Sequence, residues 1–207
     1  MAYRETPQVR ARKEAVRERL LVAAQELVAQ RGFGAVSVSE IATQAGVATG
    51  SVYLHFPSKA ELFSEVFRSA SQREVNKVTQ AIQQAGTAQQ RLERALAQFA
   101  RRALRGKQLA WALIAEPIDP LVDKDRLEYR RRYATVFEQV IQEGVQNQEF
   151  PPQDARVASA ALVGAIAEAL VGPLAPRPED HTLDESQLIP SILKFCIRAI
   201  TGQEHTP

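Results

Sequence analysis

Apolar residues recur at helical spacing along almost the whole chain, and nowhere do apolar and polar residues alternate over the length of a strand. Val16, Leu20, Ala23 and Leu27 form the stripe of a first helix over about residues 10–31, and Gly32 is the residue expected to end it. The same spacing predicts helices over about residues 38–45, 49–55, 58–85, 87–105, 108–115, 121–148, 154–170 and 186–201. The sequence therefore predicts an all-α protein of about nine helices without an internal repeat.

Two short segments predict where helices begin. Residues 37–40 and 58–61 each place a serine three residues before a glutamate. In such a capping box the serine hydroxyl accepts the glutamate N–H, and the glutamate carboxylate accepts the serine N–H. We therefore expect Ser37 to cap a short helix and Ser58 to cap a long one.

Residues 37–56 read SVSEIATQAGVATGSVYLHF, which predicts two helices of about seven residues joined by a turn that contains glycine. This is the pattern of a helix-turn-helix. The residues that can pack inward are Ile41, Ala42, Ala45, Val47 and Val52. The second helix keeps a polar outer face, free to enter a major groove, with Thr49, Ser51, Tyr53 and His55.

The run from Gly32 to Glu61 resembles the DNA-binding domain of the tetracycline-repressor (TetR) family. The family pattern there is a glycine, two further residues, Tyr-x-His-Phe, and a lysine three residues on. The resemblance covers roughly residues 12–70, and beyond them only the helical character and the length agree. It implies a helix-turn-helix domain followed by a helical domain for ligand binding and dimerisation.

The resemblance also implies roles for single residues in DNA binding. Tyr53 and Lys59 are implied to contact backbone phosphates, and His55 is implied to be a further contact. Ser37 caps the supporting helix and can offer its amide region to a phosphate. The start of the recognition helix, where base edges are reached, is formed by Thr49, Gly50 and Ser51.

One position departs from the family pattern. Ala48 stands just before the recognition helix, where the family usually has serine or threonine, and alanine is a poor N-cap. Either Thr49 takes part of that role or one phosphate contact is missing.

The basic residues at the start of the first helix have two interpretations. They are a solvated helix face, or they contact phosphates or the minor groove, and Arg17 is our candidate for such a contact. The group consists of Arg10, Arg12, Lys13, Arg17 and Arg19. We expect a flexible basic arm over residues 1–12, a DNA-binding domain over 13–70 and an effector-binding and dimerisation domain over 71–207.

Charge is spread unevenly along the chain. Residues 1–60 hold 8 Lys and Arg against 5 Asp and Glu, a net +3, while the remainder holds 18 against 19, a net −1. A basic end on a near-neutral body fits a protein that faces a polyanion, although such a difference is small enough to arise by chance. The N-terminus has no apolar core of a secretory signal, and the apolar stretch over 157–174 is short and interrupted by polar residues. We therefore expect a cytoplasmic protein without a membrane partner.

Enzymatic chemistry is disfavoured by the residues available. The histidines are His55, His181 and His205, and Cys196 is the single cysteine, so a zinc set of Cys and His cannot be assembled. The glycines over 32–34 form a turn between two helices, without the strand that precedes a nucleotide-binding loop. We expect no enzymatic activity, no cofactor and no metal.

The last two helices are the predicted dimer interface. The segment 154–170 is small or apolar on nearly every face, so most of its surface must be buried. The simplest arrangement is a two-fold four-helix contact with a second copy, although an ordinary monomer core is the alternative. The predicted interface residues are Ala158, Ala161, Leu162, Ala165, Ala169, Ile192, Phe195 and Cys196.

An effector pocket is predicted beside the helix over 121–148. Arg126 and Arg130 continue the apolar stripe of this helix, where unpaired charges do not belong. Either they reach solvent or pair with Glu116, Asp119 or Asp123, or they hold an anionic head group at the mouth of a pocket. The second interpretation favours an amphipathic acid over a cation, because no acidic residue falls on this face near the aromatic residues. The predicted lining is Phe99, Trp111, Arg126, Tyr129, Arg130, Tyr133 and Phe137.

The most favoured function is a ligand-responsive repressor that binds a palindromic DNA operator as a homodimer and is released by an unidentified small molecule. The alternative is a TetR-like DNA-binding protein or activator without a small-molecule effector, controlled by a protein partner. A purely structural helical bundle is disfavoured by residues 47–59.

Overall fold

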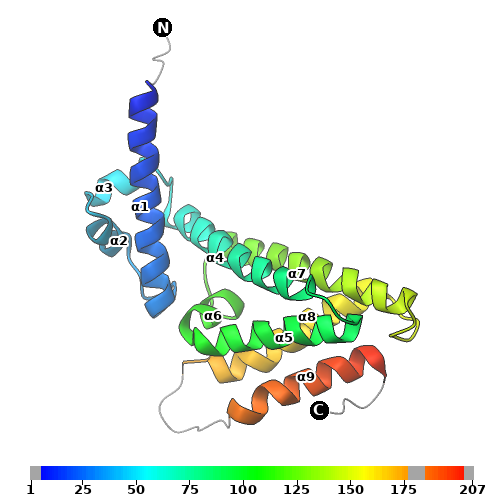
Figure 1. The fold of residues 1–207 in the computed structure, drawn as a ribbon. Coiled ribbons are helices and arrows are strands. Elements are labelled where there is room, and N and C mark those ends of the chain that lie inside the picture. The colour runs from blue at the N-terminus through cyan, green and yellow to red at the C-terminus, as the bar shows by residue number, and fades with distance from the viewer. Residues whose placement is uncertain (1–5, 177–184, 203–207) are drawn as a thin grey trace.

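The computed structural model describes residues 6–176 and 185–202, and these residues form nine helices and no strand (Figure 1). This confirms the all-α prediction. The helices are α1 (Pro7–Arg31), α2 (Val38–Ala45), α3 (Thr49–Val52), α4 (Lys59–Ile82), α5 (Ala88–Arg105), α6 (Lys107–Ile114), α7 (Pro120–Gln146), α8 (Ala155–Leu174) and α9 (Glu185–Thr201).

The first helix begins earlier than its apolar stripe predicts. The hydroxyl of Thr6 accepts the N–H of Val9 at 3.3 Å, and Pro7 takes the first helical position, where its missing N–H costs nothing. The prediction of a flexible arm over residues 1–12 is therefore wrong for residues 7–12, which are helical, and residues 1–5 lie outside the described part. A cap three residues beyond the last apolar stripe position extends the helix into solvent.

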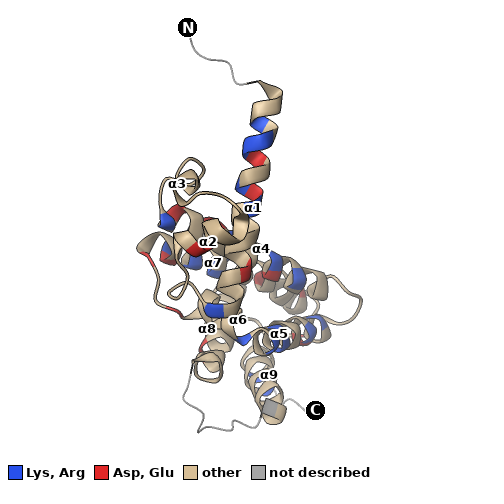
Figure 2. Ribbon diagram, turned by 90° about the vertical axis from the view of Figure 1, so that its left-hand side faces the viewer, with Lys and Arg blue, Asp and Glu red and all other residues tan. Residues whose placement is uncertain are grey.

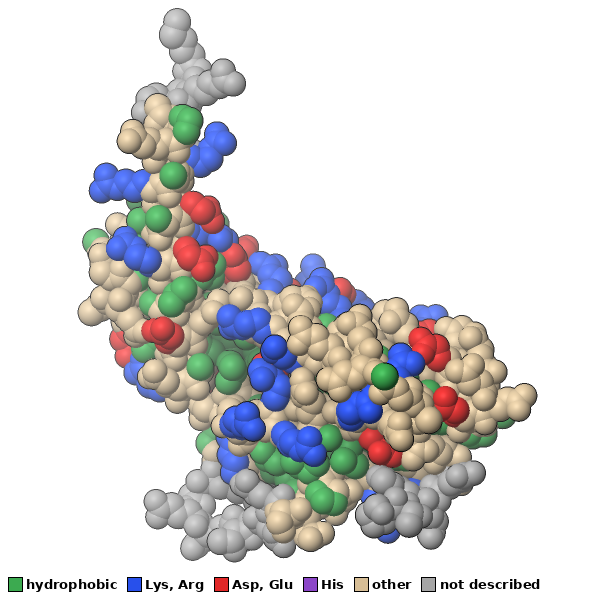
Figure 3. Space-filling view, in the orientation of Figure 1, with side chains coloured by type: hydrophobic (Ala, Val, Ile, Leu, Met, Phe, Trp, Pro, Cys, Tyr) green, Lys and Arg blue, Asp and Glu red, His purple; other side chains and the backbone are tan. Residues whose placement is uncertain are grey.

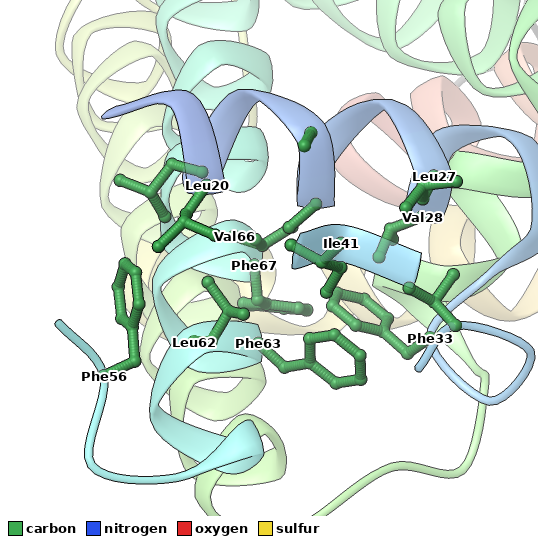
Figure 4. Packing of buried hydrophobic residues seen from close by; sticks show 14 of the residues in the cluster. Leu20, Leu27, Val28, Phe33, Ile41, Phe56, Leu62, Phe63, Val66 and Phe67 are labelled. Carbon is green, nitrogen blue, oxygen red and sulfur yellow. The ribbon is translucent and has the colours of Figure 1, made fainter. Parts of the chain in front are cut away.

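Three helices and the start of α4 enclose the core of the N-terminal part. Phe33, in the turn after α1, packs against Phe63 with ring centroids 5.2 Å apart and against Phe67 at 6.4 Å. Figure 4 shows these rings facing Ile41 of α2 and Val28 of α1. The predicted inward residues of the helix-turn-helix are buried as expected, with Val47 partly so, and the fully enclosed set includes Leu20, Ala24, Val28, Ile41, Ala42 and Leu62.

The helix α4 belongs to two cores. Its first half contributes Leu62 and Val66 to the N-terminal core, which also takes Tyr129 from α7, and its second half contributes Val78 and Ile82 to the core of the body. The body packs α4, α5, α7 and α8 together and places α9 against α5 and α8. We had expected the boundary inside this helix, and its exact place at residues 70 and 71 stays a prediction.

One side of α8 is buried and the other is uncovered. Leu162, Ile166 and Leu170 lie in the core of the body, whereas Val157 and Ala161 are exposed. By length and composition alone α8 could cross a membrane. Its inner side, however, packs against α5, α6, α7 and α9, as that of a core helix does.

Candidate DNA-binding face and effector cavity

The helix α2 is held by the predicted capping box. The Ser37 hydroxyl accepts the N–H of Glu40 at 3.2 Å, and the Glu40 carboxylate accepts the N–H of Ser37 at 2.9 Å. The hydrogen bond from the Ser37 hydroxyl is the main cause that lowers the pKa of Glu40 to about 2, with help from the Ser37 N–H and from Arg31 at 2.8 Å. Glu40 therefore stays ionised and keeps the start of α2 fixed.

The second capping box is half formed. The Ser58 hydroxyl accepts the N–H of Glu61 at 3.1 Å, but among the described residues Glu61 returns no bond to Ser58. The start of α4 is still capped, and Lys59 occupies its first position with the ammonium 4.9 Å from the centre of the Phe63 ring. This contact places the exposed ammonium of Lys59 beside the helix-turn-helix.

The recognition helix α3 is shorter than predicted. It ends at Val52 instead of residue 55, because the N–H groups of Leu54 and His55 bond to carbonyls three residues back in a tighter turn. Phe56 is buried and Pro57 follows it, and a residue before proline is disfavoured in a helix. Tyr53 and His55 therefore lie on the turn after α3.

The outer face of α3 is open. Thr49 and Gly50 are exposed, Ser51 is half-buried, and no side chain caps the helix at Ala48. The first N–H groups of α3 consequently face solvent and are available to an anion such as a DNA phosphate. Whether Thr49, Gly50 and Ser51 contact bases stays a prediction.

Leu54 is a surface residue that the sequence pattern did not single out. It lies on the turn after α3 and is 83% exposed, the largest value among the exposed large hydrophobic residues of the described chain. An exposed leucine next to a DNA-reading helix can contact a thymine methyl group in the major groove. Only the tight turn at residues 53–55 brings it out, and helical spacing alone does not show this.

Arg17 is engaged within the protein. Its guanidinium donates to Glu65 of α4 and lies 5.0 Å from the centre of the Phe56 ring, and the bond to Glu65 raises its pKa. A guanidinium held in this way joins α1 to α4, so Arg17 is better placed to position the helix-turn-helix than to bind a phosphate. Arg10, Arg12 and Arg19 remain exposed along α1, where Figure 2 shows basic side chains on the half that extends from the body.

A cavity of about 270 Å³ lies among α4, α5, α6, α7 and α8. Its walls are largely aromatic and aliphatic, and Phe99 and Tyr133 meet edge to face at 5.4 Å. Burial raises the pKa of Tyr133, which therefore stays a hydrogen-bond donor. Of the seven residues predicted to line an effector pocket, six line this cavity, namely Phe99, Arg126, Tyr129, Arg130, Tyr133 and Phe137.

Trp111 does not line the cavity. The side of α6 that faces the cavity carries Leu109, Ala110, Leu113 and Ile114, at helical spacing, and Trp111 falls beside this row. It packs against the core of the body, half-buried. The prediction that Trp111 forms a pocket wall is therefore wrong.

Charged residues in the cavity wall are mostly basic. Arg102, Arg105, Arg126 and Arg130 line it together with one acidic residue, Glu74. Figure 3 shows Lys and Arg side chains gathered around apolar surface near α6. The sequence interpretation that no carboxylate lies near the aromatic residues is wrong, because Glu74 comes from α4, a different helix.

Glu74 is neutralised by a bidentate ion pair. Its two oxygens accept from Nε and Nη2 of Arg102 at 2.5 Å and 2.6 Å, and this pairing raises the pKa of Arg102. Within the described residues neither Arg105 nor Arg130 has a hydrogen-bond or ion-pair partner, and both are exposed. The cavity thus presents unpaired positive charge next to apolar walls.

The predicted dimer residues fall into two groups. Leu162, Ile192 and Cys196 are buried in the core of their own chain, so their assignment to an outer surface is wrong; burial also raises the pKa of Cys196 to about 11. The outer group consists of the exposed Ala161, Ala169 and Phe195 and the half-buried Ala158 and Ala165. Helices that are apolar on most faces did not reveal from sequence which face is turned inward.

A helix-turn-helix with an exposed reading helix, joined to a helical body that contains an apolar cavity, defines a DNA-binding transcription regulator with a separate small-molecule site. The model of the N-terminal domain of bacterial regulatory proteins of the tetR family matches residues 20–66, and the model of a tetracyclin-repressor-like C-terminal domain matches residues 69–170. The chain belongs to the TetR family.

Relatives agree with this assignment over most of the chain. The HTH-type transcriptional repressor KstR2 of Rhodococcus jostii is 30% identical over 142 residues, which cover 67% of this chain and 69% of the relative. The fatty acid metabolism regulator protein of Bacillus subtilis is 26% identical over 157 residues, covering 72% and 78%. The fold is that of the transcriptional regulator FadR from Bacillus subtilis, solved in complex with stearoyl-CoA, with a TM-score of 0.73 at 24% identity over 88% of this chain and 98% of that one.

Proposed function

We propose that this protein is a cytoplasmic repressor that leaves its operator when an amphipathic anion, first of all an acyl-coenzyme A thioester, occupies the cavity of the body. The observation that carries this proposal is the lining of the cavity, where four arginines stand against one glutamate beside aromatic walls. An acyl chain suits those walls, and a phosphate or carboxylate suits an arginine. The FadR relative with bound stearoyl-CoA supports the same class of ligand. The proposal assigns the protein no catalytic reaction.

The effector test is a panel of ligands on the intact protein. We expect stearoyl-CoA, a short-chain acyl-CoA or a free fatty acid to raise Tm and to release operator DNA, and lipophilic cations to do neither. Arg130→Ala should weaken that response about 10-fold, because hydrogen bonds to charged groups contribute about 1.5–3 kcal/mol. Calorimetry and operator release measured with the same ligands check both statements.

Arg131→Ala is the matched control for Arg130→Ala. Arg131 is the next residue on α7, is exposed, pairs with Glu128 at 3.5 Å and does not line the cavity. Its loss should leave the response unchanged. Release of the operator by cations alone, or an intact acid response in Arg130→Ala, rules out the anion cavity.

We propose that DNA is bound through the open face of α3 and the residues that follow it. Lys59→Ala should weaken binding to all sequences alike and reduce the slope of log affinity against log salt by about 0.9, the value for one phosphate contact. Ser51→Ala should instead change the preference among operators by about 1–3 kcal/mol. Fluorescence anisotropy with selected and scrambled duplexes at several salt concentrations separates the two effects.

Lys77→Ala is the control for charge on α4, since Lys77 lies on the same helix beyond the helix-turn-helix and is exposed. It should leave the salt slope unchanged. An unaltered affinity of Lys59→Ala at low salt would show that α3 does not approach the DNA in the proposed way.

We propose a homodimer formed by the uncovered faces of α8 and α9. Val157, Ala161 and Gly164 form an exposed row on α8, and a Cβ built at Gly164 meets nothing within 4 Å. Phe195 on α9 is 64% exposed, unusual for a phenylalanine without a partner. Small residues allow the helices of two copies to approach closely, and a two-fold dimer matches a palindromic operator.

Activation in place of repression is favoured by one relative. The transcriptional activator FasR of Mycolicibacterium smegmatis is 39% identical over 83 residues, 40% of this chain. Transcription in vitro from a promoter that carries the selected operator distinguishes the two outcomes.

A further inference from the structure

Glu116, in the loop between α6 and α7, holds the turn between α1 and α2. Its Oε2 accepts the N–H of Phe33 at 2.9 Å, and its Oε1 accepts the N–H of Gly34 at 2.8 Å. Hydrogen bonds to a carboxylate are stronger than those between neutral groups. The body of the protein is thus bonded directly to the turn that leads into the helix-turn-helix.

The turn and Glu116 approach each other very closely. Gly32 has a φ of +80°, and a Cβ at this position would lie 2.8 Å from Glu116 Oε2 and 2.9 Å from Gln108 Nε2. Glycine is therefore needed at residue 32 both for its left-handed conformation and for space. The contact between the two parts is fitted at atomic distance.

Arg126, which lines the cavity, holds the other side of the same loop. Its guanidinium donates to the carbonyl oxygens of Leu113 at 3.1 Å and of Glu116 at 2.7 Å, and it also pairs with Asp123. These carbonyls stand at and just after the end of α6, where the helix leaves its last acceptors unsatisfied. The Arg126 side chain is only 15% exposed, so a residue of the cavity wall caps α6 from within.

We infer that Arg126 and Glu116 form the link by which an occupied cavity acts on the helix-turn-helix, an inference that rests on the effector part of the proposed function. An anion in the cavity competes with the α6 carbonyls for the guanidinium, since a charged acceptor binds it more strongly than a neutral one. As Arg126 turns toward the anion, the end of α6 loses its cap, and Glu116 loses the position from which it holds Phe33 and Gly34. Both residues are positioning residues that act on DNA through the turn.

The decisive experiment needs no ligand. Backbone amide exchange at Phe33 and Gly34 is measured by NMR in the full chain, for Glu116→Ala and Arg126→Ala against the unmutated protein. Glu116→Ala removes the acceptor itself, and Arg126→Ala removes only the support of the loop. We expect both variants to raise exchange at these two amides by about 10-fold, as the loss of a local closed state does.

Arg130→Ala is the matched control, because Arg130 also lines the cavity from α7 but donates to no α6 carbonyl among the described residues. It should leave exchange at Phe33 and Gly34 unchanged. Protection of Val140 and Ile141 in the core of the body reports that each variant is folded. Should Arg126→Ala not fold, Arg126→Lys, which keeps the charge with fewer donors, should give an intermediate exchange rate.

The double variant tests whether the two residues act as one link. If they do, Glu116→Ala with Arg126→Ala raises exchange no further than Glu116→Ala alone, whereas independent effects multiply. Full protection of both amides in Arg126→Ala and Arg126→Lys, or multiplied effects in the double variant, overturns the inference.

The same amides then report on stearoyl-CoA added to the unmutated protein. We expect saturating thioester to raise their exchange, and Glu116→Ala to bind the thioester with unchanged affinity while the ratio of operator Kd with and without it falls toward one. A thioester that binds and releases the operator without altering the two amides overturns the inference. Failure of any thioester to bind overturns the proposed effector alone, because the ligand-free comparison still decides the link.

Discussion

Ala161→Arg is expected to convert the protein to a monomer and to lower its operator affinity by about 10²–10⁴-fold, the gain that two linked binding events provide. Ala161 is exposed on α8, so an arginine there leaves the core of the chain intact. In a two-fold contact, however, the added charges of two copies lie close together and lack partners. Sedimentation velocity gives the mass, and anisotropy with the selected operator gives the affinity.

The control is Gln142→Arg, which adds the same charge at an exposed position of α7. It should remain a dimer and bind the operator as the unmutated protein does. A monomeric unmutated protein at micromolar concentration, or a dimeric Ala161→Arg, would contradict the proposed interface.

Phe33→Ala is expected to destabilise the protein by about 3–5 kcal/mol, the usual cost of removing a buried phenylalanine ring. The Phe33 ring is 1% exposed and contacts two further rings, those of Phe63 and Phe67. The cavity left behind is enclosed by α1, α2 and α4 and cannot collapse easily. Urea denaturation followed by circular dichroism measures the loss.

Leu127→Ala serves as the comparison, because Leu127 is a large apolar residue that is exposed on α7. Its removal should change the free energy of unfolding by less than about 0.5 kcal/mol. An equal loss in both variants would mean that Phe33 is not part of the core. Since Phe33→Ala keeps the backbone N–H that Glu116 accepts, the effect belongs to the side chain.

The DNA-binding part could be predicted well from the sequence because its signals are local. A serine three residues before a glutamate predicted the cap of α2, and the spacing of Ile41, Ala45 and Val52 predicted which side packs inward. The extent of α3 was wrong, because the buried Phe56 and the following proline decide where the helix stops. Periodicity does not contain that information.

The cavity could be predicted only in part, because its wall is built from five helices. The spacing along α7 brought together Tyr129, Tyr133 and Phe137, but Glu74 and Arg102 meet only through the packing of α4 against α5. The grip of Glu116 on the turn spans 83 residues of sequence to Phe33 and has no periodic signal. The pairing of Arg126 with Asp123 was one of two alternatives, and the structure combines it with a place in the cavity wall.

The passage of α4 through both cores limits how this protein can change over evolution. Phe67 belongs to the N-terminal core and Val78 to the core of the body, on one uninterrupted helix. A residue inserted between them would rotate one part against the other by about 100° and shift it by about 1.5 Å, because these are the steps of an α-helix. Both cores would then lose their fit at once. Descendants of this protein are therefore expected to change length in the loops, while the number of residues from Phe67 to Val78 stays constant.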